Sequence, residues 1–362
     1  MMRAAPSPIH RRWAEGWSQS AVPRFPRGMA HPTHVPDPLT RAPFRGSWAV
    51  DHGLLSRRQL DSGAWVRILR DVYRFGGLLE TDEVRAAALR LVLPADAVVC
   101  GRTAAWLHGV WTPVPGAPIP LEFARHTMGS GEGLIGARKR RLALMPTMLD
   151  DVAELRDGCF GDLVLVRGVP ATSALRTCFE LVRDRPLVEA VVVADAFAYS
   201  GALTLPWLHA YVQLHRGWPG VRQAREVVEL ASSYARSSGE SRLRMIVVLG
   251  ALPEPHVNVG VWAEGSGTLI GIPDLTLTRV PRPAALEYDG AYHGHLEQRV
   301  ADIGRENRFA LESSLPLLRF GRNDVRLRYH ATLRQIVRAT GVTHWRPLED
   351  RHFRRSSRDR MW

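Results

Sequence analysis

The spacing of apolar residues changes from region to region along the chain, and the first folded pattern begins near Ser47. Ser56 suits the N-cap of a short helix over the letters RRQL, and the run from Trp65 to Phe75 alternates as strands do. This pattern predicts a compact helix-turn-helix with a following β-wing. Two longer helices are expected next, over 82–93 and 101–109.

The middle of the chain predicts a mixed α/β module. Residues 113–170 hold many Pro and Gly residues between short β-like runs, and helical spacing returns over 173–181 and 187–199. A further helix is expected to open near Leu203, and another covers 220–234.

The C-terminal third predicts a mixed sheet flanked by helices. Its elements follow in the order helix, three strands, helix, strand, helix, or αβββαβα. The expected ranges are 238–249, 257–262, 268–278, 284–289, 297–312, 315–320 and 328–340.

The chain is long and apolar enough to form several domains. Its 362 residues give room for two or three, and a hydrophobic content of 45% excludes disorder throughout. Residues 1–45 alternate Pro, Arg, His and Gly without a period, which predicts a disordered leader. We expect a winged helix-turn-helix-like domain at 46–112, an α/β module at 113–225, the C-terminal domain at 226–345 and a basic tail at 346–362.

The formal net charge of +12 suggests a polyanionic partner, because Arg side chains neutralise phosphates and release counterions. Much of this charge lies at the ends: the leader holds seven Arg against two acidic residues, and the tail six against three. Lys139 is the single lysine, and the arginine bias reflects either phosphate binding or the composition of the source.

The cysteines Cys100, Cys159 and Cys178 are widely spaced and form no CxxC pair, which argues against a disulfide framework and a thiolate zinc site. No apolar signal-peptide core is present, and no stretch reaches about 18 uninterrupted apolar residues. We therefore expect a soluble cytoplasmic protein without a membrane partner.

Acidic residues mark the strands of the C-terminal domain. In the run ALEYDG, Glu287 and Asp289 share one face of a strand because side chains alternate, while Tyr288 points the other way. Asp274 lies on the preceding strand, and the turn-like run RVPRPA lets the two strands pair as a hairpin. Glu240 opens a helix that is expected to reach the same end of the sheet.

Four carboxylates that converge on one point repel each other unless a cation is bound. The sequence therefore predicts a site for Mg²⁺ or Mn²⁺, the hard divalent ions that prefer oxygen ligands. Such an ion orients a water molecule and lowers its pKa, which suits hydrolysis of phosphodiester bonds. His293 is a candidate base or phosphate contact, and Arg305 and Arg319 are candidate phosphate contacts.

The C-terminal third also carries a specific resemblance. The runs GESRLR, PDL, LEYDGAYH and LPLLRF, with Asp302 and Arg305 on the intervening helix, resemble the PD-(D/E)xK endonuclease superfamily. The chain is similar in particular to small proteins related to very-short-patch repair endonucleases. This resemblance implies a restriction-endonuclease-like fold and metal binding by Glu240, Asp274 and Glu287.

One position departs from the pattern of that superfamily. Asp289 stands where the lysine of (D/E)xK is usual, and an aspartate cannot polarise a water molecule as a lysine does. Three alternatives are open: His293 or Arg305 replaces the lysine, a second metal ion binds at Asp289, or the domain is inactive.

The N-terminal part carries a second resemblance. The runs LLSRRQL, DVYRFG, GRTAAWLHGV and SALRTCFELV are similar to AbiEi-type antitoxin modules of abortive-infection systems. The resemblance implies a winged helix-turn-helix that binds DNA, with Arg57 and Arg58 as candidate contacts to the DNA backbone. The usual recognition helix, between Gln59 and Tyr73, is expected to be shortened to about a dozen residues.

Structural roles compete with these functional ones. Glu240 also suits the first turn of a helix, where a carboxylate interacts favourably with the helix dipole. Asp289 suits a simple Asp-Gly turn, and Arg305 suits ion pairs within its own helix. A solvated helix face explains Arg57 and Arg58 equally well.

Two functions are consistent with these features. The first is a Mg²⁺-dependent DNA endonuclease of DNA repair or phage defence, fused to an AbiEi-like module that helps to select DNA. The alternative is a DNA-binding, antitoxin-like regulator whose nuclease-like domain is inactive, with a cognate toxin or a repair factor as a further partner. Cleavage of RNA instead of DNA fits the same residues.

Overall fold

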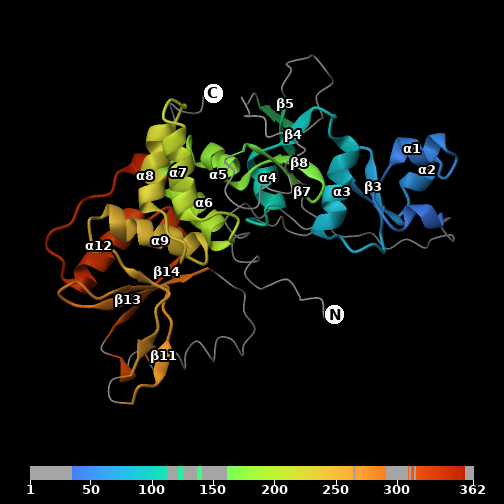
Figure 1. Ribbon diagram of the computed structural model, residues 1–362. Coiled ribbons are helices and arrows are strands. Elements are labelled where there is room, and N and C mark those ends of the chain that lie inside the picture. Colours follow the sequence, from blue (N-terminus) through green and yellow to red (C-terminus); the bar gives the residue numbers. More distant parts are fainter. Residues whose placement is uncertain are drawn as a thin grey trace. The chain divides into compact units, whose positions relative to one another are not determined.

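The computed structural model describes residues 35–111, 121–125, 137–140, 161–263, 266–290, 309, 311–313 and 315–354. These residues fall into two compact units, one that runs to Glu180 and one that starts at Leu181. Both combine helices with β-sheets, as the predicted α/β class requires (Figure 1). No helix in the described ranges is long and apolar enough to cross a membrane.

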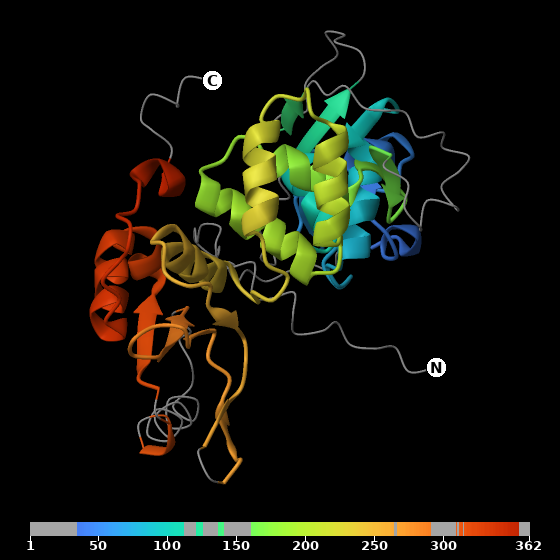
Figure 2. The same cartoon turned by 60° about the vertical axis from the view of Figure 1, so that its left-hand side comes forward.

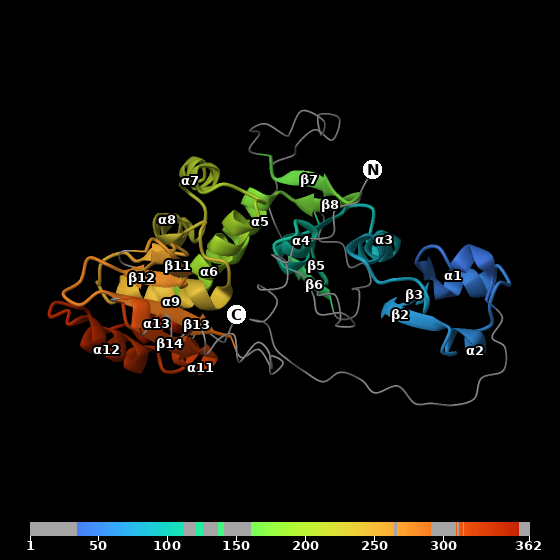
Figure 3. The ribbon, with the colours of Figure 1, turned by 90° about the horizontal axis from the view of Figure 1, so that it is seen from below.

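The N-terminal unit opens with two short helices beside a three-stranded antiparallel sheet of order β1-β3-β2 (Figure 3). Ser56 caps the second helix as predicted, because its side chain accepts a hydrogen bond from the Gln59 N–H and the Gln59 side chain bonds back. Phe44, Leu60 and Trp65 contribute to the core. The bounds are 3-10 helix Asp37–Leu39, β1 Phe44–Arg45, α1 Gly46–Asp51, α2 Arg57–Leu60, β2 Trp65–Leu69 and β3 Val72–Phe75.

The predicted boundary of the leader at residue 45 is wrong. Leu39 and Phe44 are buried in the same core, and the Phe44 ring packs edge-on against Trp65 with centroids 5.2 Å apart. These two apolar residues stand among Pro and Arg, where no periodic pattern reveals their burial. The first 34 residues of the expected leader lie outside the described residues.

A five-stranded mixed sheet of order β6-β5-β4-β8-β7 forms the rest of the N-terminal unit. Trp106 lies in its core and donates from Nε1 to Asp82 Oδ1 at 2.8 Å. Both helices expected before residue 110 are present. The bounds are α3 Asp82–Val92, β4 Ala97–Val99, α4 Gly101–Leu107, β5 Leu121–Arg125, β6 Ala137–Arg140, β7 Leu163–Val166, β8 Val169–Thr172 and α5 Ala174–Val182.

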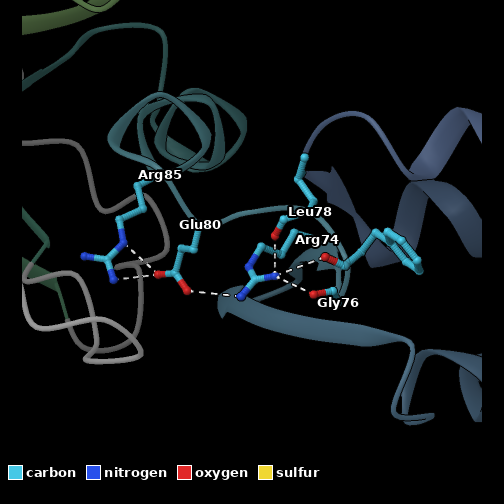
Figure 4. Close-up of polar contacts among 6 residues, drawn as sticks. Arg74, Gly76, Leu78, Glu80 and Arg85 are labelled. Atoms are coloured by element: carbon cyan, nitrogen blue, oxygen red, sulfur yellow. Dashed lines mark hydrogen bonds and ion pairs between the residues drawn. The ribbon is translucent and has the colours of Figure 1, made fainter. Parts of the chain in front are cut away.

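A chain of ion pairs joins strand β3 to helix α3 (Figure 4). Glu80 lies between two arginines: its Oε2 is 3.3 Å from Arg74 Nη2, and its Oε1 is 2.6 Å from Arg85 Nη2. Arg74 also donates to backbone carbonyls of the turn after β3. All three charged side chains are largely buried, so each needs the others as counter-charges and donors.

The C-terminal unit contains a four-stranded mixed sheet of order β14-β13-β12-β9 and a separate β10–β11 hairpin. Strands β13 and β14 are parallel, and the other pairs of the four-stranded sheet are antiparallel. The bounds are α6 Leu187–Tyr199, α7 Leu205–Leu214, α8 Val221–Leu230, α9 Ser238–Leu249, β9 His256–Val257, β10 Val261–Trp262, β11 Leu269–Gly271, β12 Leu275–Leu277, β13 Ala284–Asp289, β14 Leu317–Gly321, α11 Arg322–Arg326, α12 Tyr329–Thr340 and α13 Asp350–Phe353.

The two faces of the four-stranded sheet are covered differently (Figures 1 and 2). Leu275, Leu286 and Phe320 belong to a core that includes residues of α9 and α12. On the opposite face, Ala285 packs with Ile270 of the β10–β11 hairpin. One face is therefore committed to a helical core, and the hairpin covers part of the other.

The C-terminal unit starts well before residue 226, where we expected its boundary. Arg242 of α9 forms a bidentate pair with Glu189 of α6, with both contacts at 2.7 Å. Asp195 of α6 accepts a hydrogen bond from the Ser232 N–H at 2.7 Å. Helix α6 thus packs with the sheet-bearing part of the chain, which its apolar sequence alone does not reveal.

The predicted basic tail begins too early. Leu348 is buried in the core of the C-terminal unit, and the Phe353 ring stacks on Tyr329 with centroids 4.0 Å apart. Residues 346–354 are therefore part of the fold. Residues 355–362 lie outside the described ranges.

Helix α9 approaches strand β13 closely at Gly239, where an added Cβ would overlap the Tyr288 ring. Alanine normally stabilises a helix by about 1 kcal/mol relative to glycine, but this overlap reverses the sign. We expect Gly239→Ala to lower the free energy of unfolding by about 1–3 kcal/mol in urea denaturation. Gly217→Ala, where the added Cβ meets open space, is the matched control. Equal stability of the two variants would contradict the close approach.

Asp195 is a fully buried acid, and burial raises its pKa to about 7 although the Ser232 N–H and the charge of Arg244 lower it. Between the ordinary value of 3.8 and about 7, the folded state binds a proton that the unfolded chain does not, so stability falls as pH rises. Asp195→Asn keeps an acceptor for the Ser232 N–H and removes this titration.

We therefore expect the free energy of unfolding of the wild-type protein to fall by a few kcal/mol, roughly, across this pH window. The Asp195→Asn variant should not show this fall. Denaturant titrations at several pH values measure the difference. Glu226→Gln, which changes an exposed acid of α8, should keep the wild-type profile. Parallel profiles for Asp195→Asn and wild type would show that Asp195 does not titrate in this range.

Candidate functional site

Three neighbouring strands bring charged residues into one row across the C-terminal sheet. Leu275 pairs with Leu286 in antiparallel register, so Asp274 comes opposite Glu287 at the next position. On the other side of β13, Glu287 pairs with Arg319 of the parallel strand β14. The hairpin predicted for the strands that carry Asp274 and Glu287 is therefore confirmed.

The carboxylates of Asp274 and Glu287 have defined partners. Asp274 Oδ2 accepts a hydrogen bond from the Tyr288 N–H at 2.7 Å, which ties the end of β12 to β13. Glu287 is buried, and its Oε2 lies 3.2 Å from Arg319 Nε. A buried carboxylate requires such a counter-charge, because removal from water is costly for an unpaired ion. Arg319, predicted as a phosphate contact, thus lies directly beside a predicted metal ligand.

Asn258 extends the row on the far side of Asp274, and the sequence analysis missed it. Its backbone N–H donates to Asp274 O at 2.9 Å, and its Nδ2 donates to Glu240 Oε2 at 3.0 Å. Asn258 has a φ of 54°, a left-handed conformation that asparagine tolerates better than most residues. The signal in the sequence was an asparagine inside the strand-like run 257–262. Asn258 links Glu240 to the strand of Asp274.

Glu240 lies in the first turn of α9, as predicted, and is buried. Its carboxylate Oε2 also accepts a hydrogen bond from the Arg236 N–H at 2.8 Å, and its own N–H donates to the Ser237 hydroxyl at 3.2 Å. These bonds cap the helix at its N-terminus. The structural role that competed with metal binding is therefore present at Glu240.

Asp289 ends strand β13 and is exposed, two residues beyond Glu287. Alternation places it on the face of Glu287, while Tyr288 packs against the core on the side of α9, as predicted. Within the described ranges, no three Asp, Glu, His or Cys side chains gather closely enough to hold a metal ion. The expected convergence of four carboxylates is thus not found there. His293 and Arg305 lie outside the described residues.

Asp274 and Glu287 are the pair whose chemistry suits a divalent ion. Mg²⁺ is often held by one or two carboxylates, with waters and substrate phosphate oxygens completing its shell. Asp274 Oδ2 lies 2.7 Å from the backbone N of Tyr288, the residue after Glu287, so both carboxylates lie at the same end of the β12–β13 pair. The donors present therefore fit the predicted Mg²⁺ or Mn²⁺.

The candidate DNA contacts of the N-terminal unit lie on α2. Arg57 and Arg58 are both exposed at the start of this helix, which spans only four residues. Residues 61–64 form turns, and the antiparallel strands β2 and β3 occupy the predicted alternating run from Trp65 to Phe75.

No known family model matches the chain. It is 28% identical over 216 residues to the uncharacterized proteins MT2308 and Rv2248 from two strains of Mycobacterium tuberculosis, a match that covers 58% of this chain and 71% of each relative. The solved structure of the RV2827C protein from Mycobacterium tuberculosis covers 63% of this chain and 86% of its own, with 14% identity and a TM-score of 0.31. A TM-score this low does not establish a common fold. The chain is similar to mycobacterial proteins whose names state no activity, so its function has to be inferred from its own residues.

Proposed function

We propose that the C-terminal unit is a metal-dependent endonuclease that hydrolyses phosphodiester bonds in DNA. The observation that supports this most is the opposition of Asp274 and Glu287 on adjacent strands, with Arg319 beside them. The motifs that resemble the PD-(D/E)xK superfamily, which lie between α9 and β14, support the proposal as well.

Asp274 and Glu287 would hold Mg²⁺ or Mn²⁺ through their carboxylate oxygens. When bound, such an ion supplies a water molecule of lowered pKa and stabilises negative charge on phosphate oxygens. Arg319 orients Glu287 through their ion pair, and its guanidinium is suited to a phosphate oxygen of the substrate.

Arg319 also bears on the missing lysine of (D/E)xK. Position 289 carries an aspartate, and the positive charge beside Glu287 comes instead from the neighbouring strand β14. An arginine does not give up its proton in proteins, so it contributes charge and orientation and cannot act as a base. Abstraction of a proton from water would fall to a carboxylate or to His293.

The N-terminal unit would select DNA. Its two short helices, followed by an antiparallel strand pair, suit a winged helix-turn-helix, with Arg57 and Arg58 positioned to contact phosphates. Such contacts fix position on the duplex without reading bases.

A second candidate function is a DNA-binding regulator with an inactive nuclease-like unit. The bonds that engage the carboxylates favour it: Glu240 caps α9, and Glu287 is paired with Arg319, so neither depends on a metal ion. Calorimetric titration with Mn²⁺ separates the two functions. A regulator would bind DNA with a steep salt dependence and take up no ion, whereas an endonuclease binds the ion.

Cleavage of plasmid DNA tests the first proposal. We expect Mg²⁺- or Mn²⁺-dependent nicking that falls more than about 100-fold in Asp274→Asn and in Glu287→Gln, since even the hydrogen-bond partners of metal ligands are worth about 10–100-fold. Asp274→Asn retains an acceptor for the Tyr288 N–H, which protects the fold. Glu226→Gln is the matched control and should cleave normally. Undiminished nicking by folded Asp274→Asn protein would refute the assignment.

Salt-dependent DNA binding tests the role of the N-terminal unit. We expect the double variant Arg57→Ala/Arg58→Ala to bind more weakly on any sequence, and its slope of log affinity against log salt to shrink by about 2. The variant Arg216→Ala/Arg222→Ala removes the same charge from exposed positions of the C-terminal unit. If both double variants changed the slope equally, Arg57 and Arg58 would have no specific role.

A further inference from the structure

A cavity of about 390 Å³ lies beside the β10–β11 hairpin of the C-terminal unit. Val261 and Trp262 of the hairpin line one part of it, and His256 and Thr276 of the paired strands β9 and β12 line another. The volume falls within the range of small-molecule sites, roughly 300–1,000 Å³. The hairpin is seen at β11 in Figure 1.

This cavity opens on the face of the sheet that carries Glu287. Thr276 pairs with Ala285, and directly opposed residues of a strand pair point to the same face. Glu287 follows Ala285 by two residues and therefore shares that face. Along β12, Thr276 is two residues from Asp274, roughly 7 Å. One ligand of modest size can therefore contact both the cavity and the carboxylate pair.

The Thr276 hydroxyl is the polar group that indicates a binding role for this cavity. Thr276 is 5% exposed, it lines the cavity, and its Oγ1 has no hydrogen-bond partner among the described residues. A buried hydroxyl without a partner is costly, whereas a ligand that offers a donor or an acceptor removes this cost. A second polar pair borders the cavity, since His256 Nε2 and Thr278 Oγ1 lie 3.2 Å apart.

Trp262 supplies a flat aromatic surface at the same place. Its side chain is 60% exposed although it lines the cavity, and Val259 beside it is also exposed. Of the tryptophans in the described ranges, Trp262 is the most exposed, and it is one that lines this cavity. Aromatic side chains in nucleic-acid-binding proteins stack on bases irrespective of sequence, and a base also carries hydrogen-bonding groups on its edge.

We propose that this cavity binds an unpaired nucleobase of a DNA strand. The face of the base stacks on Trp262, and its edge bonds to the Thr276 hydroxyl. The inference rests on the proposed endonuclease function, and it names the substrate: a strand with an accessible base next to the bond that is cut, as opposed to a continuous duplex. A base held there places the adjoining phosphate toward Asp274 and Glu287.

The test uses the full-length protein in EDTA with DNA oligonucleotides that contain 2-aminopurine, whose fluorescence is quenched by stacking. Cleavage is then absent, and binding is measured alone. We expect a single strand to be quenched and to bind more tightly than a fully paired duplex. Trp262→Ala should weaken binding of the single strand about tenfold. Trp207→Ala, which removes an exposed tryptophan of α7 in the same unit, is the matched control and should have no effect.

Thr276→Val gives a second, independent arm. Valine has nearly the same shape without the hydroxyl, so the variant should melt at the wild-type temperature or above while it binds the 2-aminopurine strand several-fold more weakly. Wild-type affinity in both Trp262→Ala and Thr276→Val, or a preference for the paired duplex, would overturn the inference.

The two proposals fail in different ways. Quenching that depends on Trp262, in a protein that never cuts DNA with Mg²⁺ or Mn²⁺, would leave the base site standing and remove the endonuclease. Metal-dependent cutting that is unchanged in both cavity variants would refute the base site and leave the endonuclease standing.

Discussion

The C-terminal sheet depends on the burial of one of its faces. Leu275, Leu286 and Phe320 must all point to the core shared with α9 and α12, because a slip of one residue would turn each of them to the other side. This requirement fixes the register of β12, β13 and β14 together. Glu287 and Arg319 are thereby sent to the opposite face as neighbours, and Asp274 is placed across from Glu287. The arrangement of the charged row follows from the packing of apolar residues.

The acids Asp274, Glu240 and Glu287 all have partners within the fold. Asp274 closes the end of the hairpin, Glu240 caps α9, and Asn258 joins the two. Groups held in this way lose little freedom when a ligand arrives, which is the condition for a preorganised site. The same bonds mean that a substitution at these positions changes structure and chemistry together unless the replacement keeps the acceptor.

Elements with a strong period could be predicted from the sequence to the residue. The expected ranges 187–199, 238–249 and 284–289 are the bounds of α6, α9 and β13. The alternating runs at 257–262 and 268–278 each proved to be two strands, since Asn258 and Pro273 lie where the chain turns from one sheet to the other. Alternation continues through such a break, so the break is set by which partner each segment finds.

The candidate site could be predicted to a similar extent. Asp274 and Glu287 are joined by a short turn, so their proximity follows from local pattern. The bond from Asn258 to Glu240 depends on packing between distant segments, which spacing along the chain does not encode. The same holds for the burial of the Thr276 hydroxyl, which has no partner among the described residues.

The close packing of α6 against α9 sets how this protein can be divided. A fragment cut at residue 226 would keep Arg242 and lose Glu189, and it would keep Ser232 and lose Asp195. Such a fragment would uncover the side of α9 that faces α6 and leave the buried guanidinium of Arg242 without its partner. The four-stranded sheet and the helices before it therefore form one folding unit, and gene fusion or exchange that preserves folding has to join the chain ahead of α6.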